Sequence, residues 1–124
     1  IFADPMYQKL CSVKGLDYSL TVLATVVSRP LLEKAVLDSG RKTLNQDTCL
    51  PFIKAFPDAE INRMSAEHCE VKLGPESQRL KIGDKVELVV GYADFTTVLH
   101  DEFYGIRDNR LETTWPILGR GKLQ

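Results

Sequence analysis

Short apolar runs, each closed by a turn signal, constrain the fold of this chain more than any other feature. The densest run, Ser19–Ser28, is rich in β-branched residues and is followed by Pro30, as is typical of a strand. Its apolar density predicts a central strand buried on both faces. Further strands are predicted at Lys34–Leu37, Ser65–Leu73 and Val86–Val90.

The clearest local prediction is a β-hairpin near the end of the chain. Phe103–Arg107 and Arg110–Trp115 flank the pair Asp108-Asn109. Both residue types tolerate a positive φ, which a two-residue hairpin turn requires. Pro116 is expected to end the second strand.

Helical signals are few. Asp4 followed by Pro5 predicts a helix start, because Asp caps free N–H groups and Pro has none to satisfy. That helix should run to about Cys11. One helical turn is expected at 41–47, and residues 48–60 are expected to form a loop. Six or seven short strands with one or two short helices predict an all-β fold, an antiparallel sandwich or partly closed barrel.

Composition limits the class of function. The 124 residues suffice for one core, and 16 basic against 17 acidic residues give no basic excess for nucleic acid or an anionic membrane. No apolar run approaches the ~20 residues of a membrane span. The three cysteines lack zinc or disulfide spacing, and free thiols suit a reducing cytoplasm. They are Cys11, Cys49 and Cys69.

The segment Gly91–Thr97 carries the strongest candidate chemistry. Tyr92 and Asp94 lie two residues apart, so in an extended segment they would point to the same face. A phenol and a carboxylate can bind a metal or transfer a proton. The alternative is a Tyr packed on the sheet and an Asp capping a turn. His100 would reach Asp94 if the backbone folds back.

Other chemical candidates are weaker. His68 and Cys69 are adjacent in a predicted strand and face opposite sides, which favours a half-buried His with a local hydrogen bond over a metal site. Gly119-x-Gly121-Lys122 lacks the glycine spacing and the Ser or Thr of a phosphate loop. Lys42 is the least ordinary lysine, and a surface position is favoured for it.

An ordered set of motifs resembles the C-terminal domain of the D-threonine aldolase and D-serine dehydratase-like family, over most of the chain. The motifs are Thr21–Pro30, Val36–Leu44, Ala66–His68, Lys81–Asp84, Gly91–Thr96 and Trp115–Gly121. Members of this family are fold type III pyridoxal-phosphate enzymes, related to alanine racemase. The resemblance implies a lyase of the D-threonine aldolase or D-serine dehydratase type, acting on small D- or β-hydroxy amino acids. A racemase-type enzyme and a non-catalytic β-barrel interaction module are the alternatives.

The resemblance also implies a domain arrangement. In the family an N-terminal (β/α)8 barrel carries the cofactor and its Schiff-base lysine, and a C-terminal β domain closes the site and supports a homodimer. Residues 1–15, which open with the apolar Ile1-Phe2-Ala3, would then be the end of the barrel and a linker, and 16–124 the C-terminal domain. Asp4 and Tyr7 would lie near the cofactor, because barrel active sites lie at the strand C-termini. This chain alone should be inactive.

The family's metal motif, His-x-Asp or His-x-Cys, falls on Tyr92-x-Asp94. A neutral imidazole is a good ligand for zinc or manganese, whereas a phenol with a pKa of ~10 must first lose its proton. We therefore expect a weak or absent metal at Asp94 and Tyr92, with His100 as the replacement ligand. Without a metal, Tyr92 would act as an acid or base beside the cofactor.

Overall fold

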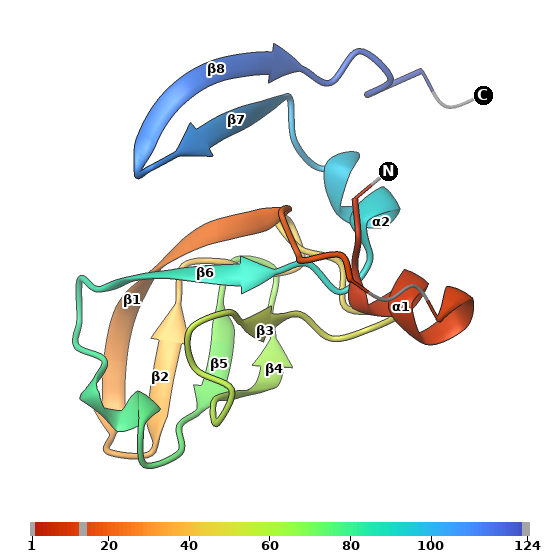
Figure 1. The fold of residues 1–124 in the computed structure, drawn as a ribbon. Helices are drawn as coiled ribbons and strands as arrows, with labels where there is room; N and C mark the ends of the chain where they lie inside the picture. Colours follow the sequence, from red (N-terminus) through yellow and green to blue (C-terminus); the bar gives the residue numbers. More distant parts are fainter. Residues whose placement is uncertain (1, 13–14, 123–124) are drawn as a thin grey trace.

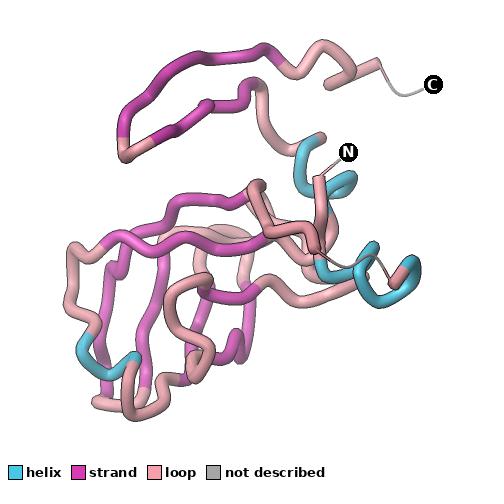
Figure 2. Tube along the Cα trace, viewed as in Figure 1, coloured by secondary structure: helices cyan, strands magenta, loops and turns pink. Residues whose placement is uncertain are grey.

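The computed structural model describes residues 2–12 and 15–122, apart from the side chain of Leu10, and contains two sheets (Figures 1 and 2). The larger sheet has six strands in the order β3-β6-β1-β2-β5-β4, with every neighbouring pair antiparallel. Its edge strands β3 and β4 contact each other, which nearly closes the sheet into a barrel. The elements are α1 (Pro5–Cys11), β1 (Thr21–Leu31), β2 (Lys34–Leu37), β3 (Phe52–Ile53), β4 (Glu60–Met64), β5 (Cys69–Lys72), the 3-10 helix η1 (Ser77–Arg79), β6 (Lys85–Val89), α2 (Ala93–Thr97), β7 (Glu102–Arg107) and β8 (Arg110–Pro116).

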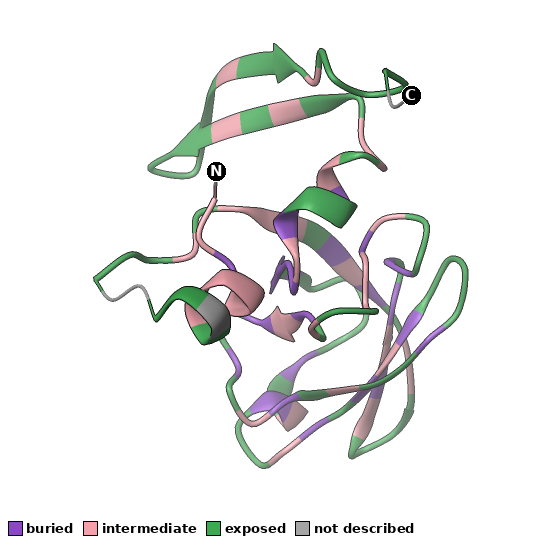
Figure 3. Ribbon diagram, turned by 90° about the vertical axis from the view of Figure 1, so that its right-hand side faces the viewer, coloured by how far each residue is buried: buried purple, intermediate pink, exposed green. Residues whose placement is uncertain are grey.

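The all-β prediction with short helices is therefore confirmed, and the core lies inside the barrel (Figure 3). β1 is central, but the prediction that it is buried on both faces is wrong. Ala24 and Val26 are buried, whereas Leu23 is 65% exposed. A barrel strand shows one face to the core and the other to solvent, so its residues alternate.

Three strand boundaries differ from the predictions. β1 continues through Pro30, because the β1–β2 register is irregular between Ser28 and Leu31 and a proline is tolerated there. The strand predicted at Ser65–Leu73 is instead the turn and second strand of a hairpin, since the N–H of Ser65 donates to the carbonyl of His68 at 2.8 Å. The predicted loop at 48–60 contains β3 and the first residue of β4.

The region predicted as one helical turn, 41–47, begins with a hydrogen-bonded turn and does not become a helix. Leu44 N–H donates to the carbonyl of Gly40 at 2.9 Å, and an irregular segment follows. No helix in the described ranges is long and apolar enough to cross a membrane.

The predicted hairpin is confirmed as β7–β8. Asp108 and Asn109 have φ of 48° and 58°, so both turn residues adopt the positive φ that a type I′ turn needs. The hairpin forms its own two-stranded sheet and stands apart from the barrel (Figure 1). Its base is held by the ring of Phe103 against Phe2, with centroids 5.4 Å apart.

The predicted first helix is confirmed, and its cap joins two parts of the molecule. Asp4 is fully buried. Its Oδ1 accepts from the N–H of Tyr7 at 2.8 Å, which caps α1, and its Oδ2 accepts from the N–H of Ala93 at 2.7 Å, at the start of α2. One carboxylate therefore holds the first turns of both helices side by side. The apolar run at Ile1 begins outside the described residues.

Asp4→Ala should lower the free energy of unfolding by about 2–4 kcal/mol, because two buried N–H groups lose a charged acceptor. Chemical denaturation measures this change. Asp47→Ala is the matched control, since the Asp47 side chain accepts only from the neighbouring Asn45 and is exposed. Equal effects of the two substitutions would contradict the joining role of Asp4.

Gly91→Ala tests the close packing before α2. A Cβ at Gly91 would lie 1.8 Å from the carbonyl oxygen of Cys49, so the backbone must move to admit it. We expect a loss of about 3 kcal/mol in urea denaturation, at the upper end of the usual cost of overpacking. Gly119→Ala, where a Cβ meets nothing within 4 Å, should cost far less.

Candidate functional site

The candidate site is a cluster in which two phenols share one carboxylate oxygen. Tyr92 Oη donates to Asp94 Oδ2 at 3.1 Å, and Tyr7 Oη donates to the same oxygen at 3.0 Å. Tyr7 lies on α1, whereas the other two lie at the start of α2. The cluster therefore depends on the two helices that Asp4 joins.

The structure brings Tyr92 and Asp94 together by a route other than the one predicted. The segment is not an extended strand: Tyr92 is extended, with φ −144°, and Asp94 already belongs to the first turn of α2. The hydroxyl of Thr96 donates to the carbonyl of Tyr92 at 3.0 Å and fixes this turn. An acidic residue in a first helical turn also interacts favourably with the helix dipole.

The two phenol rings belong to a small aromatic cluster. The ring of Tyr92 lies 4.9 Å from that of Phe95, edge to face, and 6.0 Å from that of Tyr7. Such contacts restrict the orientation of the phenols. Asp94 itself is exposed, so the cluster opens to solvent.

The carboxylate keeps both phenols protonated. The hydrogen bond to Asp94, with burial and the negative charge adding to it, raises the pKa of Tyr7 to about 12. The hydrogen bond that Tyr92 itself donates to Asp94 is the main cause that raises the pKa of Tyr92. Neutral phenols are hydrogen-bond donors here and poor metal ligands.

A metal ion at Asp94 and Tyr92 does not fit the donor set. Both phenols direct O–H groups at Oδ2 of Asp94, so the carboxylate has only Oδ1 left for a metal. His100, the predicted replacement ligand, donates from Nε2 to the carbonyl of Thr43 at 2.8 Å, so that nitrogen is occupied. Among residues 2–12 and 15–122, no group of three His, Cys, Asp or Glu side chains could hold a metal ion.

Of the residues predicted near a cofactor, Asp4 and Tyr7 differ in their accessibility. Both oxygens of Asp4 accept backbone N–H groups and the side chain is fully buried, so Asp4 positions its neighbours. Tyr7 is partly exposed and reaches Asp94. The family resemblance implied only that Tyr7 lies near a cofactor, and no local signal in the sequence indicated its contact with Asp94, 87 positions away.

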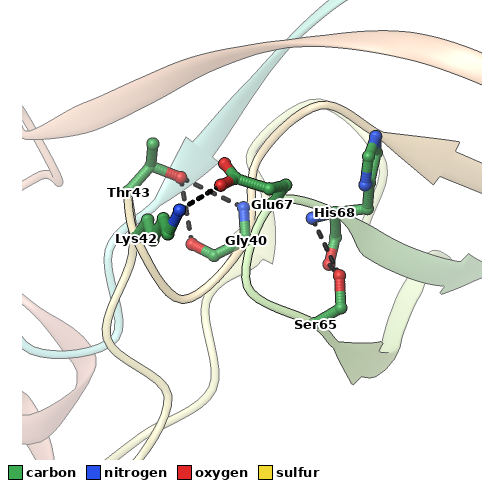
Figure 4. Close-up of polar contacts among 6 residues, drawn as sticks. All are labelled: Gly40, Lys42, Thr43, Ser65, Glu67 and His68. Atoms are coloured by element: carbon green, nitrogen blue, oxygen red, sulfur yellow. Dashed lines mark hydrogen bonds and ion pairs between the residues drawn. The ribbon is translucent and has the colours of Figure 1, made fainter.

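Two of the other candidates, Lys42 and His68, lie on neighbouring surface segments that the ion pair of Lys42 with Glu67 connects (Figure 4). Lys42 forms an exposed ion pair with Glu67, as expected for a surface lysine, and the hydrogen bond to Glu67 raises its pKa. His68 is exposed in the turn between β4 and β5 rather than half-buried in a strand. Cys69 beside it is buried, and burial raises its pKa to about 12.

The titration of the phenols tests the cluster. In Asp94→Asn the pKa values of Tyr7 and Tyr92 should fall toward the ordinary 10.0, which the near-ultraviolet absorbance of tyrosinate reports. A phenol with a raised pKa stabilises the fold below its unfolded pKa. The Tyr7 contribution should therefore be lost as the pH rises from 10.0 to about 12.

Glu102→Gln is the control for that titration. Tyr104 donates to Glu102 at 3.1 Å on the separate hairpin, so this substitution should lower only the pKa of Tyr104. If the highest tyrosine pKa had the same value in Asp94→Asn and in the parent, the shared-oxygen geometry would be wrong.

Comparisons with known proteins identify the family that this chain matches and its relatives. Residues 19–106 match the family model described as "Putative serine dehydratase domain". A 3-hydroxy-D-aspartate aldolase of Paracoccus denitrificans is 36% identical over 128 residues, covering 98% of this chain and 33% of that protein. A D-threonine aldolase of Arthrobacter sp is 35% identical over 105 residues, covering 85% of this chain and 28% of that protein.

A solved structure agrees with both. The crystal structure of D-threonine aldolase from Filomicrobium marinum matches 99% of this chain with a TM-score of 0.89 and 29% identity, and 35% of that protein is covered. The chain thus spans about a third of the length of these relatives. The resemblance predicted from the motifs is confirmed, and the chain belongs to the serine dehydratase domain family.

Proposed function

We propose that this chain is the small C-terminal domain of a pyridoxal-phosphate-dependent lyase that cleaves or dehydrates small β-hydroxy D-amino acids. The main support for this proposal is the sequence match to two aldolases at 36% and 35% identity. The names of both relatives specify D-amino acid substrates with a β-hydroxyl group. The TM-score of 0.89 to a third aldolase supports the same assignment.

The proposal includes the rest of the enzyme. Relatives about three times as long leave room for an upstream (β/α)8 barrel that holds the cofactor, and we propose a cytoplasmic homodimer. Residues 1–15 would join the two domains. Because Asp4 and Tyr7 contact α2, α1 would form a fixed joint between the two domains.

In the proposed enzyme, Asp94 and Tyr92 face the substrate. Pyridoxal phosphate, when bound by the barrel, supplies the electron sink, so the protein must orient the substrate and handle a proton. Aldol cleavage takes a proton from the β-hydroxyl, and dehydration adds one so that the hydroxyl leaves as water. Asp94 is the group of this chain suited to accept or return that proton, because it is exposed and beside two phenol donors.

Asp94→Ala in the full-length protein should lower the turnover of D-threonine or 3-hydroxy-D-aspartate by about a hundredfold, the usual contribution of a general acid or base. The visible absorbance of the Schiff base should remain, because the cofactor is bound elsewhere. Glu102→Ala, which removes a carboxylate that also accepts from a tyrosine, is the matched control and should leave turnover unchanged.

Two outcomes would count against the proposal, and they differ. Unchanged turnover in Asp94→Ala would remove Asp94 from the chemistry. A colourless full-length protein, with no lysine adduct after borohydride reduction in the presence of the cofactor, would reject the pyridoxal assignment and favour an interaction module. This chain alone should form no stoichiometric adduct.

A further inference from the structure

The two carboxylate oxygens of Asp94 differ in their hydrogen-bond partners. Oδ2 accepts from both Tyr7 and Tyr92, at 3.0 and 3.1 Å. Oδ1 has no hydrogen-bond partner among the described residues, and the side chain is exposed. A carboxylate oxygen has room for about two donors, so Oδ2 is filled while Oδ1 is free to accept.

The two phenols fix how the carboxylate is turned. They approach from different elements, α1 and α2, and their rings lie 6.0 Å apart. A carboxylate held by one donor can rotate about its last bond, whereas two donors from different directions restrict that rotation. Tyr7 therefore connects Asp94, which lies on α2, to α1.

We propose that Tyr7 is a positioning residue that, with Tyr92, clamps Asp94 so that Oδ1 accepts a hydrogen bond from the β-hydroxyl of the substrate without a metal ion. The proposal rests on the proposed function and extends it to Tyr7. The clamp fills Oδ2, so Asp94 could offer a metal only Oδ1, beside two neutral phenols that are poor ligands. Hydrogen bonds to the carboxylate thus replace metal coordination.

The kinetic test uses Tyr7→Phe in the full-length protein. The ring is kept and one hydrogen bond to a charged group is lost, so kcat/KM for a β-hydroxy D-amino acid should fall about tenfold or more. Binding of D-alanine, which has no β-hydroxyl, should change less than about twofold by the visible absorbance of the cofactor. Tyr104→Phe loses a similar tyrosine–carboxylate bond on the hairpin and should leave both values unchanged.

The kinetic outcomes separate the explanations. If Tyr7→Phe weakened D-alanine binding as much as it lowered kcat/KM, Tyr7 would have only a structural role and the proposal would fail. Unchanged kcat/KM would also overturn it. A parent protein inactive on every β-hydroxy D-amino acid tested would instead reject the proposed function. In that case the metal titration alone tests whether Tyr7 and Tyr92 hold Asp94 as proposed.

Metal titration tests the clamp without any activity. The 124-residue chain is titrated with Zn²⁺ or Mn²⁺ by calorimetry, as parent, Tyr92→His and the double variant Tyr7→Phe, Tyr92→His. The parent should not bind at micromolar metal, and the double variant should bind at least about tenfold more tightly than Tyr92→His, because Tyr7 no longer fills Oδ2. Micromolar binding by the parent, or equal affinity of the two variants, would overturn the proposal.

Discussion

The arrangement of the candidate site depends on one buried carboxylate. Asp4 accepts the backbone N–H of Tyr7 and that of Ala93, residues 86 positions apart in the sequence, and it is fully buried. Without these two bonds, α1 would have little to fix it against α2. A short helix has too few internal hydrogen bonds to be stable by itself, so its cap and its contacts decide where it lies.

The barrel supplies the rigid support for that junction. β6 pairs with β1 and with the edge strand β3, and it leads through Val90 into Gly91, whose backbone packs against Cys49. The start of α2 is therefore fixed on one side by the barrel and on the other by Asp4. This two-sided support places the hydroxyls of Tyr7 and Tyr92 on one oxygen of Asp94.

The site also illustrates how family membership and local chemistry can differ. The sequence match places the chain in the serine dehydratase domain family, and its fold is similar to that of a domain in a known aldolase. The residue pair at the expected metal motif, however, consists of a phenol and a carboxylate that bind each other. The chemistry available at position 92 therefore differs from that expected of a His, since a neutral phenol donates a hydrogen bond where an imidazole would donate an electron pair.

Local elements could be predicted from the sequence because their causes are local. Asp108 and Asn109 specify a type I′ turn by their tolerance of positive φ, and Asp4-Pro5 specifies a helix start. Predictions were wrong where contacts with distant parts of the chain determined the burial or the pairing of a segment. The apolar density of β1 did not show that Leu23 faces solvent, because a barrel exposes one face of each strand. The division of Ser65–Leu73 into a turn and a strand depends on pairing with β4.

The candidate residues also fall into those that the sequence indicated and those that only the tertiary structure revealed. The sequence by itself determined the all-β class and the family and indicated Tyr92 and Asp94 as candidate residues, because these rest on residue types and on motifs in order. Only the tertiary structure decided that Asp94 lies in a helical turn, that His100 binds a carbonyl, and that Tyr7 completes the cluster. The physical reason is distance along the chain: a hydrogen bond between α1 and α2 depends on how the barrel and Asp4 bring them together.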